Sequence, residues 1–239
     1  MERIRKKLIE LGLQAYNKNI ISEGKSWDLW VKRRDSLIYK LEFLEMSLTY
    51  LFQSMDSMKK EISSIDPHEN KKIYNACFKA TKTATYHLEC LIYQLLSSLD
   101  NVKSILPFFY KDLSMNTPTM RKMYRSIKKQ HRLEKTNLRN FTDTKENNWL
   151  ITDKRDEGMY GYRAEIYHWL SELCAAQASL NFPTEEFSYN LKLSLPEKLF
   201  EITRYEKEIE IEDFAKRLLN DYHSYLLNLL SSVEKDVPN

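Results

Sequence analysis

Glycine and proline are scarce in this chain, with 4 and 6 copies among 239 residues. Turn-rich β proteins need many of these residues, so their scarcity favours long helices. The three cysteines lie far apart, with no CxxC pair and no cluster with histidine. That pattern supports neither a disulfide framework nor a zinc site. No stretch reaches the roughly 18 consecutive apolar residues that a membrane span requires.

Hydrophobic residues make up 42% of the chain and charged residues 30%. This composition can build a core and still leave a polar surface. The net charge of +3 is too small to identify a partner, so the distribution of charge matters more than its sum. The charged amino terminus has no long apolar run after it, so we expect a cytoplasmic protein. Motifs for phosphate loops, dinucleotides, serine hydrolases and zinc proteases are missing, and we expect no cofactor or metal.

Apolar residues recur at steps of three and four, which predicts a mainly α protein, an antiparallel bundle of long helices in one domain, 1–239. The longest seam lies in a helix expected over about 27–64. Its positions are Leu37, Leu41, Leu44, Leu48, Leu51, Met55, Met58 and Ile62. Other expected helices cover about 2–17, 67–105, 118–140 and 162–180. The bundle core would span 2–180, followed by a small C-terminal β ribbon of alternating apolar residues in 187–211 and a helix over 213–234 packed on the bundle.

Five residues are assigned to helix ends or to the core. We expect Ser26 to cap the longest helix and Pro107 to end the next one. Trp27 and Trp30 lie one turn apart and are interpreted as core anchors rather than base-stacking residues. His87 falls on an apolar seam, where a hydrogen-bonded core histidine is favoured over a catalytic one.

The helix expected over 118–140 carries eight cations against a single acid, Glu134. Six of the cations recur at steps of four and three and would form one continuous basic stripe. These six are Arg121, Arg125, Lys128, Arg132, Lys135 and Arg139. A stripe at helical spacing can follow a phosphate backbone such as that of RNA. An acidic protein partner and a plain solvated surface are the two alternatives.

Arg163 and His168 are the candidate catalytic residues, because they follow Gly158 and Gly161 and open an apolar helix. Arginine donates two parallel hydrogen bonds to a phosphate, and histidine transfers protons near neutral pH. Such a pair can assist metal-independent RNA cleavage, in which the 2′-hydroxyl attacks the phosphate. Residues five apart lie about 140° apart on a regular helix, so the two side chains converge only if Arg163 lies at or before the first turn.

The segment 162–168 resembles the Arg-x4–6-His signature of the HEPN family of helical proteins. The resemblance implies a metal-independent endoribonuclease of defence or toxin type, with His168 as general acid/base and Arg163 as phosphate clamp. It also implies a homodimer in which two such segments face one another. The residue after the arginine is usually asparagine, aspartate or histidine in that family and is Ala164 here. This departure favours the alternative of a non-catalytic helical module that binds RNA or a protein partner.

The Arg-x4–6-His spacing occurs twice more in the chain. Arg125 and His131 form one such pair on the basic stripe. Arg217 and His223 form another in the final amphipathic helix, where Arg217 is expected to face solvent. The loop-to-helix position and the apolar surroundings favour the pair in 162–168 over both.

Overall fold

The computed structural model describes residues 1–66, 68–144, 147, 178–179, 192–193 and 210–238. Within these residues the protein is mainly helical. The helices are α1 (Glu2–Asn17), α2 (Lys25–Ser63), α3 (Asn70–Val102), α4 (Met120–Lys129), α5 (Asn137–Asp143) and α8 (Ile211–Asp236). Two 3-10 turns, η1 (Leu106–Phe108) and η2 (His131–Leu133), and two short strands, β1 (Ala178–Ser179) and β2 (Lys192–Leu193), complete the described elements.

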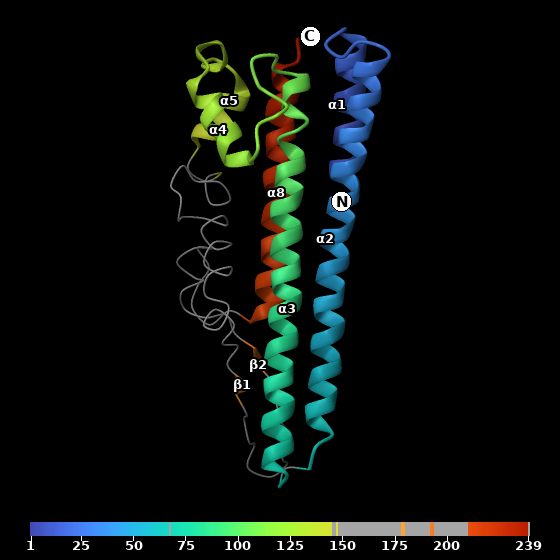
Figure 1. Cartoon of the computed structure of the whole chain (residues 1–239), viewed down its shortest axis with the longest axis vertical. Helices are drawn as coiled ribbons and strands as arrows, with labels where there is room; N and C mark the ends of the chain where they lie inside the picture. Colours follow the sequence, from blue (N-terminus) through green and yellow to red (C-terminus); the bar gives the residue numbers. More distant parts are fainter. Residues whose placement is uncertain (67, 145–146, 148–177, 180–191, 194–209, 239) are drawn as a thin grey trace.

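Two long antiparallel helices, α2 and α3, form the frame of the bundle (Figure 1). α2 has 39 residues, which corresponds to a length of about 58 Å. Its predicted seam is confirmed, because every position of that seam is buried except Leu48, which is half-buried. On α3, Ala80 and Ala84 are fully buried. Their small side chains let the two backbones approach closely.

The remaining helices enclose one end of this hairpin. α8 lies beside α3, and α1 lies along part of α2, while the far ends of α2 and α3 extend past both (Figure 1). Two buried hydroxyl pairs fix α8: Ser98 with Tyr222, and Tyr124 with Tyr225, each at 2.5 Å. Because α2, α4 and α8 all pack on the second half of α3, that half is apolar around much of its circumference.

Trp30 anchors α1 and α2 to the chain that follows α3. Its side chain is fully buried, and the rings of Phe108 and Phe109 approach it edge-on at 5.5 and 5.3 Å. Trp27 is half-buried and lies edge-on against Tyr16 at 4.9 Å. The interpretation of this tryptophan pair as core anchors is therefore confirmed.

Three helix ends differ from the predicted ones. α2 starts one residue before Ser26, after Gly24, whose φ of 78° makes a bend that favours glycine. α3 ends at Val102, and Pro107 instead lies in the first turn of η1, where its missing N–H costs nothing. α4 begins after Thr119, whose hydroxyl accepts a hydrogen bond from the amide of Lys122 at 3.3 Å.

The β ribbon expected over 187–211 is not seen in the described residues. They contain one two-residue antiparallel pair, in which Ala178 pairs with Leu193 and Ser179 with Lys192. Of this pair only β2 belongs to the expected range. The rest of that range, apart from 210–211, lies outside the described residues, as does most of the helix expected over 162–180.

Candidate nucleic-acid interface

The single helix expected over 118–140 is divided into α4, η2 and α5. The division begins at Gln130, which is extended with φ −86° and ψ 107°. A straight helix would place Leu133 about 240° around the axis from Ile127, facing away from the core. The break lets Leu133 become 95% buried, and α5 then restarts at Thr136, whose hydroxyl accepts a hydrogen bond from a backbone amide at 3.1 Å. The prediction of one continuous basic stripe is therefore wrong.

α4 retains the part of the stripe that belongs to one helix. Its ten residues include five cations and no acid: Arg121, Lys122, Arg125, Lys128 and Lys129. Its other side is buried and consists of Met120, Met123, Tyr124 and Ile127. Because the apolar side faces α3 and α8, the cations are directed outward, either exposed or half-buried.

The start of α4 is fixed by contacts from the end of α3. The Met120 amide donates to the Asp100 carboxylate at 3.2 Å. The Lys103 ammonium donates to the Pro118 carbonyl at 2.5 Å. These contacts position the basic face of α4 next to the carboxyl-terminal end of α3.

The other three stripe residues have separate surroundings. Arg132 lies 3.5 Å from the Asp112 carboxylate. The Arg139 side chain is only 20% exposed, donates to Asp143 at 2.6 Å, and also donates to the Ile127 carbonyl at 3.1 Å. Lys135 is exposed between η2 and α5. Arg139 therefore fastens α5 to the end of α4 rather than extending a phosphate-binding stripe.

The candidate catalytic pair cannot be placed in this structure. Arg163 and His168, together with Ala164 between them, lie outside the described residues. Their predicted roles as phosphate clamp and general acid/base stay predictions from the sequence.

The two other Arg-x4–6-His pairs do not form a site. Arg125 is on α4 and His131 on η2, beyond the break, and the exposed His131 ring lies 2.7 Å from the Glu134 carboxylate. Arg217 and His223 lie about 120° apart around α8, with Arg217 exposed as expected. Burial, reinforced by the nearby amino-terminal ammonium, lowers the pKa of His223 to about 4. The half-buried His223 ring lies 4.0 Å from the Glu45 carboxylate of α2 and is not paired with Arg217.

His87 is a packing residue between α2 and α3. One ring nitrogen lies 2.9 Å from the Ser54 hydroxyl, and burial lowers the pKa of the ring. The hydrogen bond expected of His87 is therefore present, but the ring is half-buried and not in the core. Cys77 and Cys90 are free, half-buried thiols, and burial raises the pKa of Cys77.

In the described part of the chain, no group of three or more histidine, cysteine or acidic residues is arranged to hold a metal ion. Nor does any helix of that part have the length and apolar character needed to cross a membrane.

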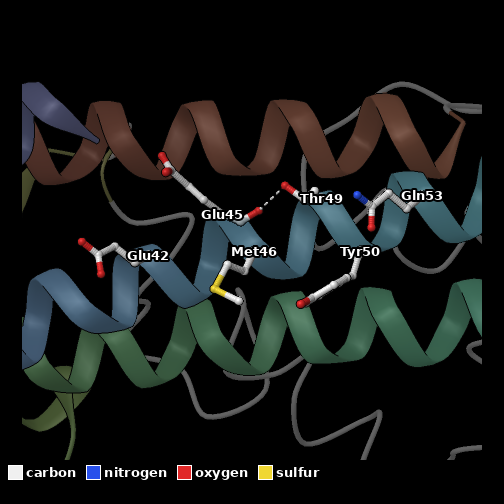
Figure 2. Close-up of a pocket in the computed structure, with 6 residues that line it drawn as sticks. All are labelled: Glu42, Glu45, Met46, Thr49, Tyr50 and Gln53. Atoms are coloured by element: carbon white, nitrogen blue, oxygen red, sulfur yellow. Dashed lines mark hydrogen bonds between the residues drawn. The ribbon is translucent and has the colours of Figure 1, made fainter.

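A surface hollow of about 420 Å³ lies on α2. Its lining residues are Glu42, Glu45, Met46, Thr49, Tyr50 and Gln53. Figure 2 shows Glu45 directed toward α8, whereas Met46 and Tyr50 turn toward α3. All six residues belong to one helix, so the hollow has no opposing wall to enclose a small molecule.

A row of exposed aromatic side chains on α3 is not among the site residues predicted from the sequence. Tyr74, Phe78, Tyr86 and Tyr93 are 71%, 53%, 62% and 57% exposed. Their steps of four, eight and seven residues along one helix, off the buried seam, were the available signal.

No family model, no curated protein and no solved structure matches the chain. The HEPN resemblance therefore gains no support beyond the short segment that carries it.

Proposed function

We propose that the protein is an RNA-binding helical bundle whose α4 contacts the phosphate backbone. The observation that carries the proposal is the charge of this helix, with five cations and no acid on ten residues. Its apolar side is buried, so every cation faces away from the core. Phosphates are the complementary ligand for such a surface, and their binding to lysine and arginine is favoured by the release of condensed counterions, so affinity falls as salt rises.

The position of two of these cations favours a functional role over a plain surface. Arg121 and Lys122 lie in the first turn of α4, where the helix dipole is positive. Each cation at this end destabilises the helix by roughly 0.3–1 kcal/mol, whereas an acidic residue at this end stabilises it. Arg121 and Lys122 are therefore unfavourable for the fold at these positions. Their presence is explained if they bind an anion.

Exchanging both residues for glutamate tests the proposal and separates binding from stability. We expect Arg121→Glu with Lys122→Glu to melt no lower than the wild type, because acids suit the first turn. The same variant should bind a labelled 20-nucleotide RNA at least about 10-fold more weakly. Its plot of log affinity against log salt should also be shallower by about 1.4, which is the loss of two contacts to a single strand.

Arg33→Glu with Arg217→Glu is the matched control, because it makes the same change in net charge at exposed positions of α2 and α8. Equal binding by both double variants would attribute the affinity to net charge alone and would rule out α4 as the interface.

The catalytic form of the proposal is a HEPN-like, metal-independent endoribonuclease acting as a homodimer, with Arg163 clamping the phosphate and His168 transferring protons. It rests on the sequence resemblance. Cleavage of labelled RNA should persist in EDTA, leave a 2′,3′-cyclic phosphate, and vanish in His168→Ala. Ala164→Asn should raise the rate, because it restores the polar residue usual in that family.

Salt-dependent RNA binding without any cleavage would favour the non-catalytic module. If RNA binding is absent as well, an acidic protein partner becomes the better explanation of the charge on α4.

A further inference from the structure

The outer face of α3 combines aromatic rings with lysines. Tyr74, Phe78 and Tyr86 are each more than half exposed, and Lys82 holds its ammonium 4.4 Å from the centre of the Phe78 ring. From residue 70 to residue 93 the helix carries four lysines and one acid, Glu89. Two of these lysines, Lys72 and Lys79, form ion pairs with Glu69 and Glu61 at 2.6 and 2.9 Å. Lys82 therefore places a positive charge among the exposed rings, which differs from a packing surface, where charge is depleted.

The row of rings runs along α3 toward the start of α4. Tyr86, Tyr93 and Asp100 are seven residues apart and therefore lie on nearly the same side of α3. Asp100 accepts a hydrogen bond from the Met120 amide, the first residue of α4, at 3.2 Å. The side of α3 that carries Tyr86 and Tyr93 thus reaches the start of α4, and the distance along α3 from Tyr74 to Asp100 is about 39 Å.

We propose that this face of α3, which we name the α3 track, binds unpaired nucleotides by stacking their bases on its aromatic rings. The track consists of Tyr74, Phe78, Lys82, Tyr86 and Tyr93. The inference rests on the proposed function, because it adds a base-binding surface to the phosphate-binding one on α4. Base stacking on aromatic rings beside a cationic groove is the usual way in which proteins hold single strands.

The spacing of the track suits this ligand. Tyr74 and Phe78 are four residues apart and lie about 6 Å apart along the axis, whereas Phe78 and Tyr86 lie about 12 Å apart with Lys82 between them. One base sandwiched between two rings needs about 7 Å, twice the stacking distance of roughly 3.4 Å. In a duplex the edges of the bases are paired and their faces are stacked on neighbouring base pairs. A duplex can therefore offer this track only its phosphates.

A second aromatic pair supplies the control. Tyr39 and Tyr50 on α2 are 59% and 52% exposed, close to the values for Phe78 and Tyr86. Glu42 and Glu45 lie beside them on the same helix, so their surroundings are acidic and repel phosphate. Replacing them by alanine removes similar apolar area from a surface that should not bind nucleic acid.

The test compares Phe78→Ala with Tyr86→Ala against Tyr39→Ala with Tyr50→Ala in the full chain, after melting curves confirm that both are folded. Fluorescence anisotropy would measure the affinity for three 20-nucleotide RNA probes: a single strand, a duplex of the same sequence, and an abasic strand. We expect the α3 double variant to bind the single strand about 10-fold to 100-fold more weakly. Its affinities for the duplex and the abasic strand should stay within about 2-fold of wild type.

An unchanged affinity for the single strand, or an equal loss with the abasic strand, would overturn the α3 track while leaving the α4 interface in place. A change of oligomeric state in the α3 variant alone would likewise overturn it, because the rings would then pack on protein. Failure of the α4 charge variant to weaken binding would instead refute the proposed function.

Discussion

Replacing Gly12 on α1 even by alanine is expected to lower the stability of the protein, because α1 lies against Trp30 of α2 at that point. A β-carbon built on Gly12 would lie 2.2 Å from the indole nitrogen and 2.7 Å from Cε2 of Trp30. The indole is fully buried between two phenylalanine rings. It would have to move by more than 1 Å in a closely packed region to restore ordinary contact.

Two effects of opposite sign decide the outcome of Gly12→Ala. Alanine in a helix interior is more favourable than glycine by roughly 0.8–1 kcal/mol. Overpacking of a dense core costs roughly 1–3 kcal/mol, and the short distances place this site in the upper part of that range. We therefore expect a net loss of about 1–2 kcal/mol in the free energy of unfolding. In a chain of this size the loss corresponds to a decrease of about 2–8 °C in Tm.

Urea unfolding followed by circular dichroism would measure this loss, with Gln14→Ala on the same helix as a control for helix propensity. A double-mutant cycle with Trp30→Phe isolates the clash, because the smaller ring removes the atoms that the new β-carbon meets. In that background Gly12→Ala should become neutral or stabilising. The reasoning is refuted if Gly12→Ala stabilises the protein with Trp30 intact, or if the cycle shows no coupling.

Two further perturbations concern α8. Its Asp236 carboxylate accepts hydrogen bonds from the backbone amides of Asn137 and Leu138 at 2.8 and 2.9 Å, so Asp236→Ala should lower the free energy of unfolding by about 2–4 kcal/mol. Lys235→Ala, at the exposed neighbouring position, should leave the free energy of unfolding unchanged. Equal melting temperatures of the two variants would contradict this expectation. His223 has a pKa of about 4 in the folded protein against 6.5 unfolded, so between these values the unfolded chain binds more protons and stability falls as the pH falls. His223→Gln should remove about 1–2 kcal/mol of that loss of stability, after allowance for solvent access to the ring. Urea unfolding of the wild type and the variant from pH 7 to pH 4 would measure this. If the free energy of unfolding falls equally with pH in both proteins, the assignment to His223 is wrong.

The sequence predicts the core of the long helices better than the short elements between them. The α2 seam and the anchoring role of Trp30 follow from spacing, because a helix that buries one side repeats apolar residues every three or four positions. Gln130 breaks its helix for a tertiary reason that spacing does not show, namely the burial of Leu133 after the turn. The close contact between Gly12 and Trp30 is of the same kind, since it depends on how two helices meet.

The residues of the α3 track are hard to predict from the sequence for a different reason, because the fold does not depend on them. Tyr74, Phe78 and Tyr86 lie off the buried seam, so a search for core positions gives them no role. Their rings contribute little burial to the bundle, and replacing them by alanine, a better helix former, should change the free energy of unfolding by less than about 0.5 kcal/mol. Because the exposed pair Tyr39 and Tyr50 on α2 is equally dispensable to the fold, exposure alone does not identify a ligand, and the comparison of the two aromatic pairs with probes that have or lack bases decides whether the α3 rings bind one.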